Sequence, residues 1–237
     1  MSNSYFQFKQ FRIEQDRCAM KVGTDGILLG AWANVSQART ILDVGAGTGL
    51  ISLMLAQRSA ADTQIQAIEI DTDANEQANS NFENSPWKER LSSLHVSLQD
   101  FLKKTHSSFD LIVSNPPYFI DSKKNPNEQR TLARHTDSLS YEELLCASTL
   151  LSDKGHFAVI LPHSENETFI ALAKEKGFYL THQTHVIPRI DAQPKRILLD
   201  FSKQEAETIE DELLIEIERH VYSPAFCKMT KDFYLDK

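Results

Sequence analysis

From residue 40 onward, short apolar runs alternate along the chain with stretches in which apolar residues recur at helical spacing. The apolar runs have the length of strands, and the clearest are Thr40–Val44, Gln64–Ile70 and Phe109–Asn115. Helices are predicted over Leu50–Gln57 and Thr72–Phe82, the second with Thr72 or Asp73 as its N-cap. Strands that alternate with helices at this spacing predict βαβ units and a mostly parallel sheet.

Two parts of the chain depart from this alternation. Near the C-terminus, three strand-like runs follow one another with little helix between them: Phe178–Ile187, Lys195–Phe201 and Glu212–Glu218. They predict antiparallel strands that complete the sheet at one edge. The polar stretch Phe119–Ser138 is longer than most connections in a compact domain, and such loops are usually functional or disordered.

Composition narrows the possible functions. The 237 residues carry a formal net charge of −8, which argues against a protein that coats nucleic acid non-specifically. The three cysteines are far apart, no apolar run could span a bilayer, and the N-terminus lacks the apolar core of a secretory signal. We therefore expect a cytoplasmic protein without disulfides, a metal, a membrane anchor or an obligate protein partner.

The long polar stretch is locally basic. Between Ser122 and His135 there is one acidic residue, Glu128, and four basic ones: Lys123, Lys124, Arg130 and Arg134. A local basic segment can contact the phosphates of a nucleic acid even in an acidic protein, although a solvated loop would have the same composition. These four side chains are therefore candidates for nucleic-acid binding.

The first candidate site is a glycine-rich turn, "LDVGAGTGL", directly after a predicted strand. Gly45, Gly47 and Gly49 let the backbone turn sharply and approach a ligand, and the following helix would present free amides to it. The dinucleotide pattern G-x-G-x-x-G is not met, because position 50 is leucine. Asp43, two residues before the first glycine, would disfavour a pyrophosphate and favour the cationic end of an amino acid.

Two further acidic positions fit the same ligand. Glu69 ends the next predicted strand, where a carboxylate can accept hydrogen bonds from both hydroxyls of a ribose. Asp100 follows the third strand and could accept from an adenine amino group, with Phe101 beside the ring. An adenosine joined to an amino acid satisfies all of these positions, and S-adenosylmethionine is the natural candidate.

The second candidate site is "NPPY", at the end of the fourth predicted strand. The side-chain oxygen of Asn115 and the carbonyl of Pro116 can accept both protons of a planar NH2 group, and would stabilise the positive charge that develops when this nitrogen is alkylated. Pro116 and Pro117 restrict the turn, and Tyr118 offers a face on which a base can stack. These four residues are the candidate catalytic group.

The whole arrangement resembles the class I methyltransferases, and "NPPY" looks like the motif of those that act on planar amino or amide nitrogens. The resemblance implies an α/β fold with a Rossmann-like three-layer sandwich, a seven-stranded mixed sheet and antiparallel C-terminal strands. We accordingly expect one S-adenosylmethionine-dependent domain over residues 1–237, with an N-terminal extension over residues 1–38 and a catalytic core over residues 39–237.

A closer resemblance covers nearly the whole chain. The stretches "MKVGTDGILLGAW", "DVGAGTGLISLMLAQR", "SNPPYF" and "YSPAFCKMTKDFYLDK" are similar to those of bacterial tRNA1(Val) (adenine37-N6)-methyltransferases. This resemblance implies an N6-methyltransferase that acts on the adenine beside the anticodon of a valine tRNA. It also implies that the segment around Lys21, Thr24 and Asp25 closes over the cofactor.

Other classes share "NPPY" and stay open as alternatives. Protein glutamine methyltransferases that act on release factors present an amide to the same acceptors, but usually carry an extra helical domain for which about 40 preceding residues leave no room. Guanine-N2 ribosomal RNA methyltransferases usually have phenylalanine after "NPP". Adenine-specific DNA methyltransferases need a recognition region that is not evident, and a non-catalytic binding module would be expected to lose the asparagine or the prolines.

Overall fold

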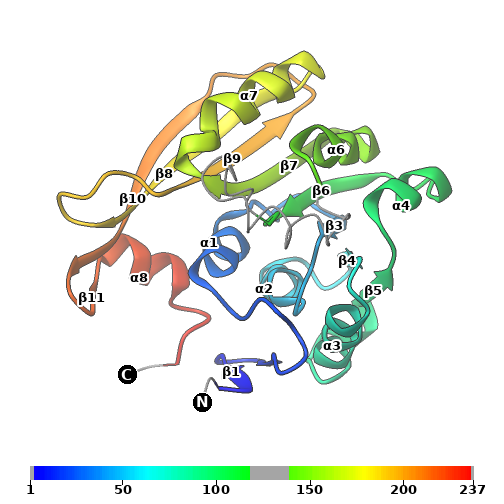
Figure 1. Cartoon of the computed structure of the whole chain (residues 1–237), viewed down its shortest axis with the longest axis horizontal. Helices are drawn as coiled ribbons and strands as arrows, with labels where there is room; N and C mark the ends of the chain where they lie inside the picture. Colours follow the sequence, from blue (N-terminus) through cyan, green and yellow to red (C-terminus); the bar gives the residue numbers. More distant parts are fainter. Residues whose placement is uncertain (1–2, 118–138, 236–237) are drawn as a thin grey trace, which may run out of the picture.

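One large sheet runs through the protein (Figure 1). The structure is a computed structural model that describes residues 3–117 and 139–235. The strands of this sheet are β3 (Thr40–Val44), β4 (Gln64–Glu69), β5 (Leu91–His95), β6 (Phe109–Ser114), β7 (Leu151–Pro162), β8 (Tyr179–Arg189), β9 (Arg196–Ser202), β10 (Ile209–Glu218) and β11 (Val221–Tyr222). Their order across the sheet is β11-β10-β8-β9-β7-β6-β3-β4-β5.

The sheet confirms the predicted mixed α/β fold and extends it. Strands β5, β4, β3, β6 and β7 are parallel, and β9 runs antiparallel to both of its neighbours, β7 and β8. The sheet has nine strands among the described residues rather than seven, because β10 and β11 are added beyond β8. Between β9 and β10 the chain crosses to the far side of β8, and β10 pairs parallel with β8. Only β9 and the short β11 therefore run antiparallel to the other strands.

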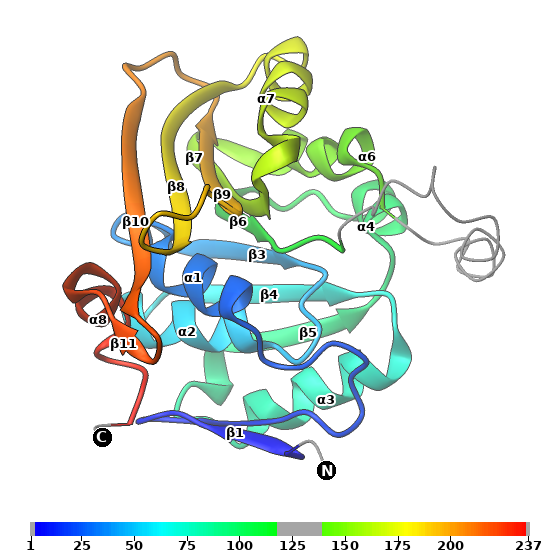
Figure 2. The ribbon, with the colours of Figure 1, turned by 60° about the vertical axis from the view of Figure 1, so that its left-hand side comes forward.

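Helices cover both faces of the sheet and give three layers (Figures 1 and 2). One face is covered by α1 (Thr24–Trp32), α2 (Leu50–Arg58), α3 (Thr72–Glu83) and α8 (Pro224–Thr230), and the other by α4 (Leu98–Lys104), α6 (Tyr141–Leu145) and α7 (Asn166–Glu175). The described residues also include short 3-10 helices: η1 (Lys88–Arg90), η3 (Cys146–Leu150) and η4 (His163–Glu165).

Alternation along the strands divides the core between the two faces. In β3, the side chain of Ile41 packs with Leu28 and Leu55 on the α1–α2 face, whereas Leu42 packs with Leu144 and other side chains on the opposite face.

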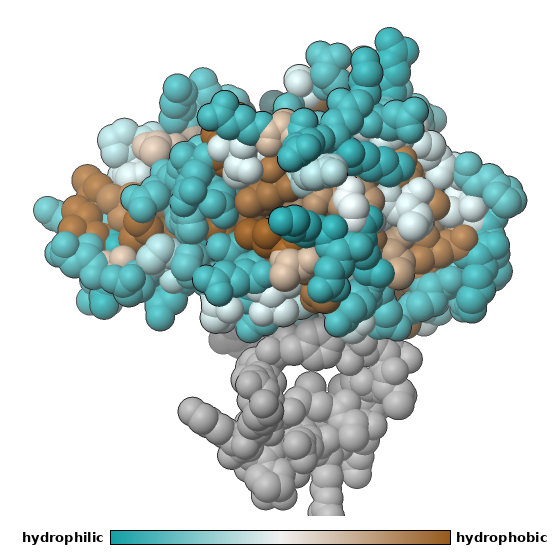
Figure 3. All heavy atoms as spheres, turned by 90° about the horizontal axis from the view of Figure 1, so that it is seen from above, coloured by the Kyte–Doolittle hydropathy of each residue, from teal (hydrophilic) through white to brown (hydrophobic). Residues whose placement is uncertain are grey.

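Outside the core, the face seen from above is mostly hydrophilic, with smaller groups of apolar side chains between the polar ones (Figure 3). In the described parts of the chain, no helix combines the length and the apolar character that a bilayer crossing requires.

The residue that caps α3 differs from the prediction. The side chain of Asp71, and not Thr72 or Asp73, accepts a hydrogen bond from the amide of Ala74 at 2.8 Å. Asp71 keeps an extended backbone (φ −81°, ψ 125°), so it is the last residue before the helix and its carboxylate faces the free amides. The helix therefore begins directly after the end of β4, close to the candidate site.

The two ends of the chain pack together beneath α2 and α3. A separate two-stranded sheet, β1 (Tyr5–Gln7) and β2 (Arg12–Glu14), lies next to α3. The amide of Lys9 donates to the carbonyl of Phe233 at 2.8 Å, and Phe8 and Phe11 share a core cluster with Phe233. The N-terminal segment is thus held against the core by the C-terminal tail (Figure 1).

Arg58, at the end of α2, fixes the position of α1. Its Nη1 donates to the carbonyls of Gly30 and Ala33, both at 2.8 Å, at the C-terminal end of α1. Helix ends leave such carbonyls without partners inside the helix. The guanidinium therefore joins α2, which starts at the glycine-rich turn, to α1, which starts beside the candidate site.

An Arg58→Met variant should lower the free energy of unfolding by about 2 to 4 kcal/mol, because it keeps the aliphatic stem but removes two charge-assisted hydrogen bonds. Urea unfolding measures this loss. The control is Arg39→Met, which removes a solvent-exposed pair with Asp62 at 3.7 Å and should change stability by less than about 0.5 kcal/mol. Equal effects of the two substitutions would contradict a special role of Arg58.

Candidate active site

In the turn between β3 and α2, the backbone conformation or the surroundings of each glycine explain why no side chain is present. Gly45, Gly47 and Gly49 all have positive φ, at 75°, 55° and 79°. A Cβ atom at Gly49 would lie 2.5 Å from Cε1 of Phe82, so α3 packs directly on this residue. A Cβ atom at Gly45 or Gly47 would meet no described atom within 4 Å, which leaves these two positions open to a ligand.

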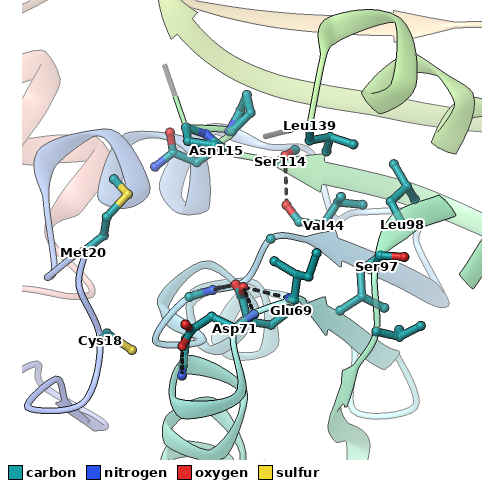
Figure 4. A pocket seen from close by; sticks show the side chains of 18 of the residues that line it. Cys18, Met20, Val44, Glu69, Asp71, Ser97, Leu98, Ser114, Asn115 and Leu139 are labelled. Carbon is teal, nitrogen blue, oxygen red and sulfur yellow. Dashed lines mark hydrogen bonds between the residues drawn. The ribbon is translucent and has the colours of Figure 1, made fainter. Parts of the chain in front are cut away.

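Glu69, at the end of β4, lies directly beside this turn (Figure 4). Its Oε2 accepts a hydrogen bond from the amide of Gly47 at 2.8 Å. Its Oε1 accepts from the amides of Ile70 at 2.8 Å and Asp71 at 3.0 Å. The carboxylate thus fixes the turn from below, and it also forms part of the wall of the adjoining cavity.

Asp43 is a buried carboxylate with one oxygen unused. Its Oδ2 accepts from the amide of Ser52 at 3.1 Å and from the Ser52 hydroxyl at 2.7 Å. Its Oδ1 has no hydrogen-bond partner among the described residues. Burial raises the pKa of Asp43 to about 6, although the Ser52 hydrogen bonds lower it and the charge of Glu69 adds to the rise. A buried acceptor without a partner is unusual, and it fits the predicted ligand with a cationic amino-acid end.

A cavity of about 280 Å³ lies at the carboxyl ends of β3, β4, β5 and β6 (Figure 4). Its walls are largely apolar, with Ile70, Val96, Leu98 and Leu139 among the lining residues. Glu69 and the turn glycines add polar backbone and side-chain groups on one side. An apolar cavity with few, fixed polar groups is the usual form of a small-molecule site.

A second cavity of about 310 Å³ adjoins the first across the glycine turn. It brings the predicted Lys21, Thr24 and Asp25 together with Gly45 and Gly47. Both cavities share Met20, Gly45, Gly47 and Asn115 in their linings. Asp25 also accepts a hydrogen bond from Nε of Arg196 at 2.8 Å, so the start of α1 is tied to the start of β9.

Asn115 is the predicted catalytic residue that the structure brings to both cavities. It follows β6 directly, is half-buried, and is one of the labelled residues around the cavity in Figure 4. The hydroxyl of Ser114 donates to the carbonyl of Val44 at 2.9 Å, which holds the end of β6 to β3. Pro116 and Pro117 line the first cavity, whereas Tyr118 and the four basic candidates Lys123, Lys124, Arg130 and Arg134 lie outside the described residues.

Four predicted cofactor residues line neither cavity. Asp43 and Gly49 are buried within the strand and the turn, and the other two are Asp100 and Phe101. Asp100 lies inside α4 with an exposed side chain, where the Lys103 ammonium at 2.9 Å lowers the pKa of its carboxyl. Phe101 is buried in the core against Phe109. The cause is local: β5 ends at His95 and α4 begins at Leu98, so Asp100 and Phe101 lie within the helix and not directly after the strand.

The residues that line the cavity at this point are Ser97, Leu98 and Gln99. Ser97 is the N-cap of α4, and its hydroxyl accepts from the amide of Asp100 at 3.1 Å. The spacing of Ser97 and Asp100 in "SLQD" is a start signal for a helix, and it would have placed Asp100 within the first turn.

The sequence interpretation also missed a short segment of the wall. Cys18, Ala19 and Met20 line the first cavity, just before the predicted Lys21. Burial raises the pKa of the Cys18 thiol to about 11, with smaller contributions from the carboxylates of Glu69 and Asp71. The thiol stays protonated at neutral pH, so it serves as a wall and not as a nucleophile. Within residues 3–117 and 139–235, no three His, Cys, Asp or Glu side chains are placed to hold a metal ion.

Comparison with known proteins shows that the chain is similar to methyltransferases over most of its length. The family model "Methyltransferase small domain" matches residues 21–160. A relative from Phocaeicola vulgatus is 51% identical over 238 residues that cover 100% of both chains, and one from Haemophilus influenzae is 48% identical over 98% of this chain and 99% of its own. Both carry the name tRNA1(Val) (adenine(37)-N6)-methyltransferase.

Solved structures agree on the fold. A protein from Agrobacterium tumefaciens described as a predicted O-methyltransferase superimposes with a TM-score of 0.68, over 88% of this chain and 96% of its own, at 18% identity. The 16S rRNA N2 G1207 methyltransferase of T. thermophilus, in complex with AdoMet and guanosine, gives a TM-score of 0.55 at 20% identity. That match covers 82% of this chain and 47% of the other.

Asp43→Asn should remove a pH dependence of stability that the buried carboxyl creates. The folded-state pKa of about 6 lies above 3.8, the ordinary pKa of an aspartate, so the folded state binds a proton more tightly, and stability falls as pH rises from about 4 through 6. The unfolding free energy of the variant relative to the wild type should therefore rise between pH 4 and pH 7, by a change on the order of 1 to 3 kcal/mol.

Chemical unfolding of the free protein at several pH values measures this difference. A variant-minus-wild-type value that does not change with pH would contradict the raised pKa. The same variant should lose most of its thermal stabilisation by S-adenosylmethionine, because its amide cannot supply a carboxylate to a cationic group.

Proposed function

This chain belongs to the family of tRNA1(Val) (adenine(37)-N6)-methyltransferases, and we propose that it transfers a methyl group from S-adenosylmethionine to N6 of adenine 37 in tRNA1(Val). The observation that carries the proposed chemistry is the position of Asn115, which lines both cavities where they meet at the glycine turn, with Pro116 beside it in the wall of the first. The full-length similarity to the relatives supports the identity of the acceptor.

The two cavities divide the cofactor between them. The apolar walls of the first cavity suit an adenine ring, and Glu69 is the group that would accept from the ribose hydroxyls. The second cavity, with Thr24 and Asp25, would hold the amino-acid end. Asp43 lines neither cavity, but its buried carboxylate with one unused oxygen, two residues before Gly45, would favour a positive charge near the glycine turn. The reacting centre then lies beside the shared residues Gly45, Gly47 and Asn115.

The bound cofactor supplies an electrophilic methyl group on a sulfonium. The task of the protein is to orient an adenine nitrogen whose lone pair is delocalised into the ring. The side-chain oxygen of Asn115 and the carbonyl of Pro116 accept the two N6 protons, which aims the lone pair and stabilises the positive charge that develops on nitrogen. Pro116 and Pro117 fix φ at the turn, so these acceptors need no reorganisation during the reaction.

Contacts to RNA are proposed from sequence. Lys123, Lys124, Arg130 and Arg134 would bind phosphates around the anticodon, and Tyr118 would stack on the target base. The enzyme must reach a base that is unpaired or flipped out of its stack, and the anticodon loop offers such a base.

The acceptor can be identified directly. The purified protein receives labelled S-adenosylmethionine with tRNA that lacks the modification, with a release-factor peptide, or with ribosomal RNA, and mass spectrometry locates the methyl group. We expect label on N6 of adenine 37 of tRNA1(Val). Label on peptide glutamine or on guanine N2, with none in tRNA, would overturn the proposed function.

Asn115→Ala should lower the single-turnover rate by about 100-fold or more, because one of two fixed acceptors for the N6 protons is lost. The dissociation constant for S-adenosylhomocysteine, measured by calorimetry, should stay within about threefold, since the glycine turn and Glu69 are unchanged.

The matched control for this prediction is Asn84→Ala, which removes another asparagine amide at the exposed end of α3. This variant should methylate at the wild-type rate. Retained activity of Asn115→Ala would refute the acceptor mechanism.

A further inference from the structure

Asn81, on α3, is a buried side chain whose hydrogen-bonding atoms are all used at a distance from its own helix. It is 2% exposed. Its Oδ1 accepts from the amide of Glu14, and its Nδ2 donates to the carbonyl of Glu14, both at 2.9 Å. The same Nδ2 donates to the carbonyl of Thr48 at 2.9 Å. One side chain thus joins the backbone of the N-terminal segment to the backbone of the glycine turn.

The turn end of this link is firmly braced. Thr48 lies between Gly47, whose amide donates to Glu69, and Gly49, on which the ring of Phe82 packs. Because Asn81 and Phe82 are adjacent on α3, the helix holds the turn by a hydrogen bond and by a packing contact at once. A shift of the Thr48 carbonyl would alter the positive-φ backbone that Gly47 presents to the cavities.

The other end of the link leads to the cavity wall. After β2, the buried Gln15 uses its Oε1 to accept from the amide of Val22 at 2.9 Å, which folds residues 15–22 into a compact loop. Cys18 and Met20 of this loop line the first cavity, and Met20 also lines the second. Fixing Glu14 therefore fixes the entry point of a loop that faces the glycine turn across the cavities.

We propose that Asn81 is a positioning residue for the cofactor, which sets the N-terminal wall and the glycine turn at the correct separation. This inference rests on the proposed function, because it takes the two cavities to be the S-adenosylmethionine site. Asn81 itself lines neither cavity, so its effect on binding is exerted through the backbones of Glu14 and Thr48.

Gln77 provides a matched control on the same helix. It is also buried, and its Oε1 accepts from the amide of Arg17 at 3.1 Å. It therefore anchors the N-terminal segment as Asn81 does, one turn earlier on α3, but none of its hydrogen bonds reaches the glycine turn. A comparison of Asn81→Ala with Gln77→Ala separates the link to the turn from general anchoring.

The expected result is a difference in cofactor binding alone. Asn81→Ala should weaken S-adenosylhomocysteine binding by about tenfold or more in calorimetry, and Gln77→Ala by less than about threefold. The KM for S-adenosylmethionine should rise in the same proportion, whereas the KM for tRNA should stay unchanged. Both proteins are measured at a temperature at which circular dichroism shows them to be folded.

Hydrogen exchange on the wild-type protein tests the link without a variant. Addition of S-adenosylhomocysteine should slow exchange at the amide of Glu14, which lines neither cavity, together with that of Gly47. Protection of Gly47 with no change at Glu14 would overturn the proposal, and so would equal affinities of the two alanine variants. If the wild-type protein bound no S-adenosylhomocysteine, the proposed function would fail and not only the role of Asn81.

Discussion

The turn from β3 into α2 requires three residues with positive φ, and the remainder of the site is arranged around that requirement. Gly49 has no Cβ, so α3 can press Phe82 against it, and the amide of Gly47 is turned toward Glu69 at the end of β4. Strands β4 and β6 flank β3 in parallel register, so their carboxyl ends meet the turn at one edge of the sheet. Asn115 follows β6 and therefore reaches the same point as the glycines.

The two carboxylates beneath the turn have opposite energetic consequences. Glu69 accepts three backbone amides and thereby satisfies both of its oxygens while it shapes the turn. Asp43 accepts two hydrogen bonds on one oxygen and leaves the other without a partner in a fully buried position. Such a group lowers the stability of the free protein, and under the proposed function the cationic end of the cofactor would recover part of that free energy. A buried residue that lowers the stability of the free protein and serves ligand binding is typical of functional sites.

Sequence reasoning succeeded where the signal was local. Two parts of the site each lie within one short stretch: the strand–glycine–helix pattern of residues 40–58, and strand β6 with Asn115 directly after it. Their periodicity and turn chemistry were therefore sufficient to predict them. It did not foresee that Asp100 and Phe101 lie inside α4, because one residue, Ser97, starts that helix directly after β5. It could not find Cys18, Met20 or Asn81, because their places depend on hydrogen bonds such as the one between Glu14 and Asn81, 67 positions apart. The direction of β10 likewise depends on a crossover past β8 and not on its own pattern, whereas β11 turns back from β10 as a short antiparallel strand.

Two of the stretches that carry the resemblance to the family, the N-terminal "MKVGTDGILLGAW" and the C-terminal "KDFYL", are connected through the fold. Phe233, in the C-terminal "KDFYL", is fully buried with Phe8 and Phe11, and its carbonyl accepts from the amide of Lys9. The tail thus holds the β1–β2 hairpin, the hairpin leads into the loop with Cys18 and Met20, and this loop forms one wall of the two cavities. Under the proposed function, both stretches would therefore act on the cofactor side of the site. Discrimination between adenine and a glutamine amide, which present the same planar NH2 group to Asn115, must then come from groups around the acceptor side.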